Sequence, residues 1–298
     1  MRVRVIVNTG GGTSTGDEDE AERIGAAFAA HGVEAEVRPT EPADIVEAFR
    51  AAAATPGLAA VVAAGGDGTL SCAAGQLAGS GRPLGILPMG TLNHLARDAG
   101  IPADLDAAAA VIAAGHSRKI DLAEVNGRLF VNNSSVGLYP DMVRLREAQQ
   151  ERTGRSKRLA MLSASLGSLR HFRRHRLWIS APGLEAPVRT PLLFVGNNRY
   201  QVNLFALGQR ERLDEGLICL YAIRARTRAH LLWAGIRGIF GRLDQQRDFV
   251  TAYVEEAEIA SDRSILALSA DGETLRMETP LKYRIRPGAL ALIVPKER

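Results

Sequence analysis

The residues with the clearest chemical meaning are Gly65-Gly66-Asp67-Gly68-Thr69, which directly follow an apolar run at residues 59–64. Glycines lack a Cβ atom, so they let the backbone approach a ligand closely. A helix that begins at such a turn attracts phosphate through its first N–H groups. Because a carboxylate repels phosphate, Asp67 is expected to bind a metal or accept a proton. The alternative is a tight turn in which Asp67 caps the helix.

Two further turns contain residue types that bind phosphate. In residues 85–93, Gly90 and Thr91 could present backbone and hydroxyl donors, and Asn93 could cap a helix or contact a nucleotide. Residues 8–12 (Asn-Thr-Gly-Gly-Gly) match neither the dinucleotide fingerprint nor the Walker motif. Each of these two turns, taken alone, could be an ordinary connection.

The turns are separated by segments that alternate between strand and helix patterns over the first 120 residues. Strand-like runs lie at 3–7, 33–38, 59–64 and 84–87, and helix-like segments lie at 19–31, 43–54, 70–77 and 105–114. Short apolar strands between helices predict a parallel sheet covered on both faces. Ligands bind such sheets at the carboxyl ends of the strands, so the two glycine turns are expected to share one crevice.

After residue 120 the pattern changes to short strands with few helices. Asn126-Gly127 predicts a hairpin turn between strands at 121–125 and 128–132. Further strand-like runs lie at 177–180, 188–196, 217–223, 249–260, 265–269 and 289–294. They predict an antiparallel sandwich or barrel over residues 121–298, whose last strand could return to the first domain. The exception is 142–176, which is expected to form a pair of helices.

Composition and charge restrict the function only weakly. The net charge of +4 and the pI near 9.3 permit an anionic partner without selecting one. Cys72 and Cys219 lie too far apart for a metal-type spacing, which favours a reduced, intracellular setting. Residues 1–7 are too few for a signal-peptide core, and no apolar window is long enough to span a bilayer. A cytoplasmic protein is therefore expected.

Four motifs, taken together, resemble the diacylglycerol kinase catalytic family, which includes sphingosine kinases and bacterial lipid kinases. They are residues 65–69, 85–93, 132–137 and 271–273, in this order along the chain. The resemblance implies an α/β nucleotide-binding domain over residues 1–120, with the Rossmann-like parallel sheet of diacylglycerol and NAD kinases. It also implies a mainly antiparallel β-sandwich as the second domain, with ATP and Mg²⁺ in the cleft between the two.

The same resemblance implies roles for individual residues. Asp67 would activate the acceptor hydroxyl or help to hold Mg²⁺, Glu273 matches the active-site acid of the family, and Asp271 would be a metal ligand beside it. Phosphoryl transfer needs mainly positioning and charge neutralisation, and such groups can provide both. The implied nucleotide contacts are Asn8, Thr9, Thr40, Gly65, Gly66, Asp67, Gly68, Thr69, Gly90, Thr91 and Asn93.

Two positions differ from the pattern of the relatives. Some bacterial relatives have a structural metal site, which here would use the Glu215 carboxylate and the carbonyls of Arg212 and Leu217. Glu215 stands there in place of the usual aspartate. His94 stands where many relatives have an aspartate directly after the asparagine, which removes one carboxylate from the expected site.

A lipid acceptor lies in a bilayer, so the enzyme needs a docking surface. Residues 144–176 contain ten Lys or Arg with apolar residues between them, and residues 227–242 repeat this pattern on a smaller scale. Basic amphipathic segments of this kind can lie on an anionic membrane surface. No aromatic platform or known module indicates binding to nucleic acid.

The sequence thus predicts a soluble, peripherally membrane-bound kinase that transfers the γ-phosphate of ATP to a diacylglycerol-like hydroxyl. NAD kinases also carry a GGDGT turn, although their characteristic Asn-Glu pair is not evident beside Asn93-His94 or Asn132-Asn133. A nucleotide- or lipid-binding regulator that lost activity through His94 is the non-enzymatic alternative. A homo-oligomer is compatible with the sequence.

Overall fold

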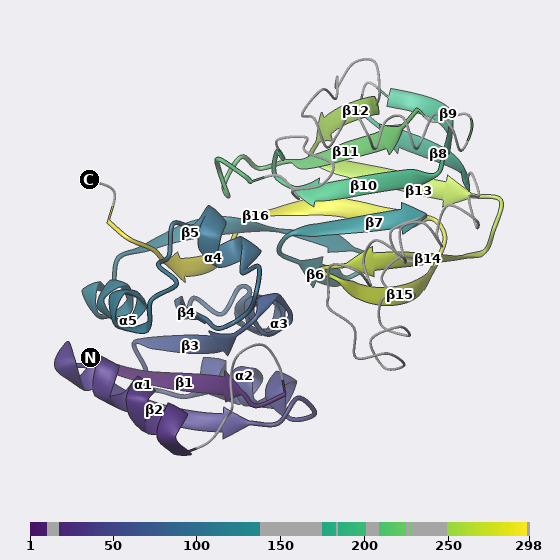
Figure 1. Ribbon diagram of the computed structural model, residues 1–298. Coiled ribbons are helices and arrows are strands. Elements are labelled where there is room, and N and C mark those ends of the chain that lie inside the picture. Colours follow the sequence, from purple (N-terminus) through teal and green to yellow (C-terminus); the bar gives the residue numbers. More distant parts are fainter. Residues whose placement is uncertain are drawn as a thin grey trace.

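The computed structural model describes residues 1–10, 18–137, 175–182, 184–200, 209–224, 227 and 249–296. These residues form two sheets, one of ten strands and one of six, with helices beside the first (Figure 1). The helices and the parallel strands form one lobe and the antiparallel strands a second, and the larger sheet extends through both.

The first lobe is built on four parallel strands in the order β2-β1-β3-β4. Every residue of β3 is buried, as expected for a strand that is covered on both faces. The parallel sheet predicted from the sequence is confirmed. The bounds are β1 Arg2–Asn8, β2 Glu34–Thr40, β3 Ala60–Gly65 and β4 Leu84–Pro88.

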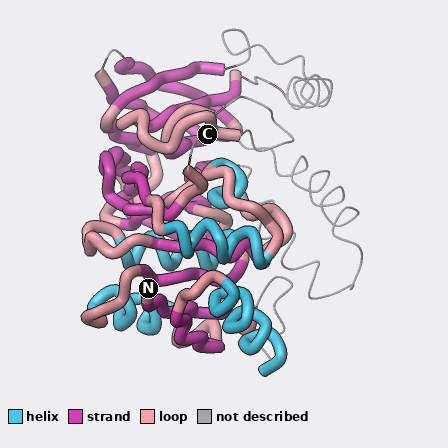
Figure 2. Tube along the Cα trace, turned by 90° about the vertical axis from the view of Figure 1, so that its left-hand side faces the viewer, coloured by secondary structure: helices cyan, strands magenta, loops and turns pink. Residues whose placement is uncertain are grey.

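Two pairs of helices cover this sheet. α1 (Glu18–Ala30) contacts α5 (Leu105–Ala114), and α2 (Ile45–Ala54) contacts α3 (Asp67–Leu77). Right-handed crossovers between parallel strands place the two pairs on opposite faces. Among the described residues, helices surround the first lobe and strands dominate the second (Figure 2).

The last strand joins the two lobes. β16 (Leu281–Ile293) pairs with β4 in parallel through Leu292 and Leu84, and it pairs with β5 (Ser117–Val125) and β13 (Glu256–Ser261) in antiparallel. Its register against β5 shifts between Arg286 and Leu290, so the strand bends as it passes from one lobe to the other (Figure 1). The sheet continues through β8 (His175–Ala181) and β9 (Leu184–Thr190).

The second lobe is a sandwich, as predicted. Its second sheet is antiparallel in the order β12-β11-β10-β7-β14-β15. The core between the sheets includes Ile259 and Tyr283 from one sheet and Leu220 and Leu268 from the other. The bounds are β7 Asn133–Gly137, β10 Leu192–Asn197, β11 Ile218–Ile223, β12 Phe249–Val254, β14 Ile265–Ala270 and β15 Glu273–Glu278.

Two strand runs expected from the sequence are each divided in the structure. Residues 188–196 belong to β9 and β10, with Pro191 between them, and residues 249–260 belong to β12 and β13, with Glu255 between them. In both cases the two strands lie in different sheets, because a one-residue break turns the chain across the sandwich. Composition alone cannot distinguish such a break from a continuous strand.

Two local expectations, a hairpin at residues 126–127 and a helix at residues 70–77, have different outcomes. The Asn126-Gly127 hairpin is confirmed between β5 and β6 (Arg128–Phe130), and both turn residues have positive φ angles of 45° and 87°. The helix expected at 70–77 begins earlier, at Asp67, with Gly66 as its N-cap. An acidic residue in the first turn is favourable beside the positive end of the helix dipole, which explains the earlier start.

Candidate active site

The carboxyl ends of the parallel strands meet at one edge of the sheet. The strand register places Asn8 beside Thr40, and Gly65 beside Pro88. The Thr9 amide donates to the Thr40 carbonyl at 3.1 Å. The Asn8 side chain donates to Thr69 Oγ1 at 2.8 Å, so the end of β1 is tied directly to the 65–69 turn.

The two glycine turns touch each other through their backbones. A Cβ atom on Gly90 would lie 2.6 Å from the Cα of Gly66, which is far inside van der Waals contact. A Cβ on Gly65 would lie 2.6 Å from Thr69 Oγ1. A side chain at either position would clash, so glycine lets the backbones of the two turns approach each other closely.

Asp67 is the first residue of α3, and it holds the second turn in place. Its Oδ1 accepts the backbone N–H of His94 at 2.6 Å, where α4 (His94–Asp98) begins. The preceding Asn93 has a left-handed backbone (φ 47°), and its side chain bonds both the N–H and the C=O of Gly90. Asp67 Oδ2 has no protein partner among the described residues, so this oxygen is available to a ligand.

His94 does not supply the carboxylate that the family resemblance implies at its position. Burial lowers the pKa of His94 below its ordinary value, and the nearby Asp67 carboxylate offsets this only in part. Its Nδ1 lies 3.2 Å from the guanidinium of Arg97. The ring is therefore neutral at pH 7, and Asp67 is the acidic group at this end of α3.

The Asp271 turn of the second lobe reaches the same helix. Asp271 and Gly272 connect β14 to β15 with φ angles of 46° and 86°. The Asp271 carboxylate accepts the hydroxyl of Ser71 in α3. It also accepts three backbone N–H groups at 2.7–3.1 Å, from residues 131, 132 and 133. Both oxygens are thus engaged by the protein, and metal binding by Asp271 stays a prediction.

Glu273 lies on the flank of α3 beyond Ser71. It pairs with Arg128 of β6, and its side chain is 60% exposed. Burial raises the pKa of Cys72, and the Glu273 charge adds to this rise, which places the carboxylate close to the thiol. Cys72 follows Asp67 by five residues, about 7.5 Å along the helix axis. Glu273, at the start of β15, therefore lies near the helix that Asp67 begins, although the two residues are far apart in the sequence.

A buried ion pair between the lobes was not predicted from the sequence. Arg210 Nε donates to Asp98 Oδ2 at 2.8 Å, and the exposed fractions of the two side chains are 0% and 1%. Burial by itself would lower the pKa of Arg210, but the neighbouring Tyr200 and Asp98 raise it above its ordinary value, so the guanidinium is charged. No local pattern signals this pair, because its partners lie 112 residues apart.

The predicted structural metal site is occupied by protein contacts. Glu215 Oε2 accepts the Arg199 N–H at 2.9 Å, and its Oε1 lies 3.7 Å from the Arg199 guanidinium. The Leu217 carbonyl accepts the N–H of Asn198 at 3.0 Å. These contacts leave lone pairs free on the Glu215 carboxylate and the Leu217 carbonyl, so the structural metal site, with Arg212 as its third ligand, stays a prediction.

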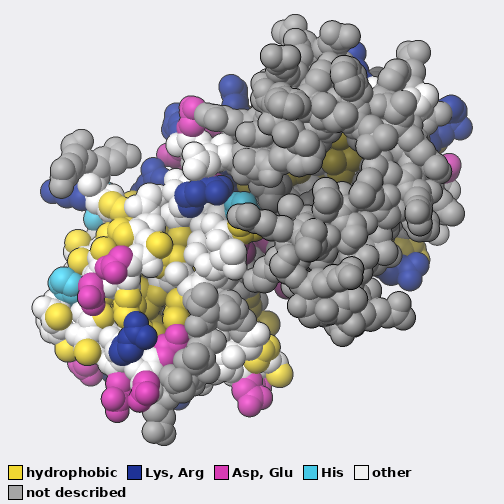
Figure 3. Space-filling model, viewed as in Figure 1, with side chains coloured by type: hydrophobic (Ala, Val, Ile, Leu, Met, Phe, Trp, Pro, Cys, Tyr) yellow, Lys and Arg dark blue, Asp and Glu magenta, His cyan; other side chains and the backbone are white. Residues whose placement is uncertain are grey.

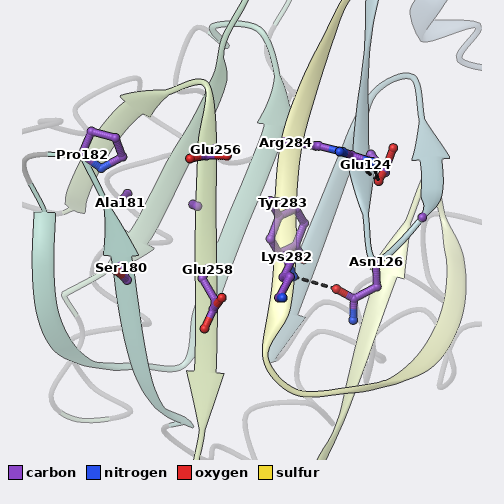
Figure 4. A pocket seen from close by; sticks show the side chains of 12 residues that line it. Glu124, Asn126, Ser180, Ala181, Pro182, Glu256, Glu258, Lys282, Tyr283 and Arg284 are labelled. Atoms are coloured by element: carbon purple, nitrogen blue, oxygen red, sulfur yellow. Dashed lines mark hydrogen bonds and ion pairs between the residues drawn. The ribbon is translucent and has the colours of Figure 1, made fainter.

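A hollow of about 920 Å³ lies on the outer face of the second lobe (Figure 4). Strands β5, β8, β13 and β16 line it. Its most buried charge, Glu124, accepts hydrogen bonds from Arg284 and Arg286. None of the predicted site residues lines this hollow. The strand ends around Asp67 are therefore the stronger candidate for the active site.

The predicted membrane-docking segments lie outside the described residues, except for Thr227 and residues 175–176, which begin β8. On the face shown in Figure 3, the described basic side chains are scattered and do not form a patch. No helix in the described part of the chain is long and apolar enough to cross a membrane.

Comparison with known proteins identifies the family. The sequence profile of the "Diacylglycerol kinase catalytic domain" matches residues 2–125. A "Probable lipid kinase YegS-like" from Pseudomonas fluorescens is 31% identical over 279 residues, which cover 90% of this chain and 88% of that protein. The chain belongs to the diacylglycerol kinase catalytic family. The present chain is also 44% identical to a "Diacylglycerol kinase" from Staphylococcus aureus over 79 residues, which cover 26% of this chain and 25% of the Staphylococcus protein.

Solved structures show the same fold for this lipid kinase. A diacylglycerol kinase from Bacillus anthracis superimposes with a TM-score of 0.70 at 18% identity, covering 99% of this chain and 97% of that chain. Yeast NADH kinase complexed with NADH superimposes with a TM-score of 0.56 at 13% identity, covering 99% and 84%. At these identities the likeness concerns the fold alone.

Proposed function

We propose that this lipid kinase transfers the γ-phosphate of ATP, with Mg²⁺, to the hydroxyl of a diacylglycerol-like lipid. The observation that carries the proposal is the position of Asp67. One of its oxygens fixes the start of α4, and the other is available where the two glycine turns meet. The family membership supports a lipid as the acceptor.

The nucleotide would lie across the carboxyl ends of β1 to β4. The 65–69 turn begins α3, so its N–H groups and the positive end of the helix dipole favour phosphate oxygens. Gly90 and Thr91 would contact the same phosphates from the second turn, because the two turns touch. The predicted contacts of Asn8, Thr9 and Thr40 fit the base or ribose side of this edge.

The Asp67 carboxylate fits Mg²⁺. This ion commonly takes one or two carboxylates and completes its shell with phosphate oxygens and water. Within the described residues no three His, Cys, Asp or Glu side chains form a metal cage, so the nucleotide would have to supply several ligands. The bound ion would neutralise charge on the transferring phosphoryl group.

Transfer would proceed in line, in one displacement. The acceptor oxygen bonds to the γ-phosphorus while the bond to the β,γ-bridging oxygen breaks, and that electron pair leaves with ADP. The proton of the acceptor hydroxyl passes to a carboxylate. This would be Asp67 if its free oxygen does not bind Mg²⁺, and Glu273 if it does. Glu273, whose carboxylate pairs with Arg128, would orient the hydroxyl.

The test is transfer of radiolabelled phosphate from ATP to mixed lipids, with NAD as a parallel acceptor. Asp67→Asn should lower kcat by about 10²–10³-fold, the usual loss when one charged transition-state group is removed. Asp106→Asn is the control, because Asp106 is also acidic in the first turn of a helix but lies in α5. Transfer to NAD alone would favour an NAD kinase.

The regulator hypothesis gives a different result in the same assay. ATP binding without turnover in the wild type, together with turnover in His94→Asp, would support it and would contradict the proposed function. His94→Asp restores the carboxylate that many relatives have at this position.

We also propose that the protein works at the cytoplasmic membrane surface through residues 144–176 and 227–242. The support is their charge and apolar spacing. Co-sedimentation with vesicles that contain anionic lipid should be strong at low salt and weaker at high salt. Equal binding to neutral vesicles would contradict an electrostatic contact.

A further inference from the structure

We propose that Arg210 is a positioning residue that keeps the Asp271 turn of the second lobe in register with Asp67 of the first. The inference rests on the proposed kinase activity, although its structural part can be tested without that activity. We call Arg210, Asp98, the Val131 carbonyl and the Asn132 side chain the inter-lobe clamp.

The clamp is completely buried. The Arg210 and Asp98 side chains are 0% and 1% exposed, and the second carboxylate oxygen of Asp98 has no hydrogen bond among the described residues. Arg210 donates the hydrogen bond to Asp98, while the Arg97 guanidinium lies farther away, at 3.8 Å from the second oxygen. A buried ion pair adds little net stability, because the cost of removing two charges from water nearly cancels their attraction. Stability alone thus gives a poor reason for placing this pair between the lobes.

The guanidinium connects three separate parts of the chain. Its Nη1 donates to the Val131 carbonyl at 2.7 Å, and its Nη2 donates to Asn132 Oδ1 at 3.0 Å. Its Nε binds Asp98 in α4, and the group stacks over Tyr200 at 5.3 Å. Only the planar fork of arginine can make these contacts together, because lysine has one flexible ammonium.

Each end of the clamp reaches a predicted catalytic element. At one end, Asp98 closes α4, whose first N–H, on His94, donates to Asp67. At the other end, the N–H groups of residues 131 and 132 donate to the Asp271 carboxylate. Asp271 in turn accepts the hydroxyl of Ser71, one turn after Asp67 in α3. The contacts form a closed circuit through both lobes, and Arg210 is its central link.

The circuit has a mechanistic consequence. In-line transfer depends on alignment, and a displacement of about 1 Å can cost roughly 10²-fold in rate. The glycine turns lie in the first lobe, and among the described residues Arg210 makes no direct contact with them. Loss of the clamp should therefore lower kcat while ATP binding is kept.

The decisive variant is Arg210→Lys, which keeps the charge and removes the fork. Arg284→Lys is the matched control, because Arg284 also binds a largely buried carboxylate, Glu124, but lies on the outer face of the sheet. We expect Arg210→Lys to bind ATP within about twofold of the wild type and to lose at least about tenfold in kcat. The control should keep the wild-type kcat.

Hydrogen exchange provides a readout that does not depend on activity. The peptides that contain residues 128–137 and 94–101 should exchange faster in Arg210→Lys and at the wild-type rate in Arg284→Lys. If the wild type phosphorylates no lipid, the proposed function fails, and the exchange rates alone still decide whether the clamp exists.

Wild-type exchange and wild-type kcat per folded molecule in Arg210→Lys would overturn the inference and leave Arg210 with a role in stability only. If Arg210→Lys does not fold, Asp98→Asn replaces it, because it keeps the shape of the clamp and removes its charge. Faster exchange in the same two peptides then supports the inference, and unchanged exchange overturns it.

Discussion

At the residue scale, the site depends on positions where a side chain is excluded. Gly66 and Gly90 come from different strand ends, and their Cα atoms are so close that a Cβ on either one meets the other turn. Asn93 locks the second turn by bonding both backbone groups of Gly90. The spacing of the two turns is therefore fixed before a nucleotide binds, which lowers the entropy cost of binding.

Gly90→Ala should weaken ATP binding. The added methyl group would lie 2.6 Å from Gly66 Cα and from Asn93 Oδ1, so the turns must separate. Overpacking of this kind costs about 1–3 kcal/mol, which corresponds to a loss of roughly 5- to 150-fold in affinity. The measurement is the Kd for ATP by calorimetry.

Gly75→Ala is the matched control for Gly90→Ala. Gly75 lies in α3, and a Cβ there meets nothing within 4 Å. Alanine should stabilise the helix by about 0.5–1 kcal/mol and leave the Kd unchanged. Equal ATP affinities in the two variants would contradict the close contact of the turns.

At the element scale, α3 is the centre of the site because both lobes attach to it. Its first residue, Asp67, accepts the first N–H of α4. Ser71, in its second turn, donates its hydroxyl to Asp271 of the β14–β15 connection. The Asp271 carboxylate has four donors from two segments. It is a strong local constraint, since hydrogen bonds to charged groups are stronger than those between neutral groups.

Asp271→Ala should destabilise the protein by about 3 kcal/mol, since it leaves three partly buried N–H groups without an acceptor. Ser71→Ala removes one donor and should cost about 1 kcal/mol. Both values are measurable by urea unfolding. The control is Asp262→Ala at the exposed turn before β14, which should change stability by less than about 0.5 kcal/mol. A cost for Asp271→Ala no larger than that of the control would contradict this reading.

At the scale of the whole molecule, β16 makes the two lobes one folding unit. Leu290, Leu292 and Ile293 belong to the core of the first lobe, while Leu281, Tyr283 and Ile285 belong to the core of the sandwich. A single strand therefore fills both cores. The domain boundary near residue 120 stays a prediction, since β5 crosses it and the first lobe needs residues from the end of the chain.

Leu292→Ala should lower the stability of both lobes together. Leu292 is fully buried beside Leu84 of β4, and removal of such a side chain costs about 2–5 kcal/mol. Circular dichroism, which reports the helices, and tryptophan fluorescence should give coincident unfolding transitions at lower urea. Val46→Ala on the exposed side of α2 is the control, with an expected change of less than about 0.5 kcal/mol. Two separate transitions would show that the lobes unfold independently.

Much of the fold could be predicted from the sequence because it depends on local signals. Apolar runs with helices between them predicted the parallel sheet, and the Asn126-Gly127 pair predicted its hairpin. The breaks at Pro191 and Glu255 were missed, because strands in either sheet of a sandwich have the same composition. The glycine motif at residues 65–69 likewise predicted Asp67 as the main candidate for the active site, because the residues of the motif are neighbours in the sequence.

The sequence by itself determined the two glycine turns, the α/β and antiparallel halves, and the family. Only the tertiary structure decided how the halves meet. It placed the Asp271 turn on α3, gave Asp271 four protein donors, and paired Asp98 with Arg210. The physical reason is that turns and amphipathic patterns arise between neighbours in the chain. Burial of a charge is decided by residues more than a hundred positions away, and no spacing rule describes that distance.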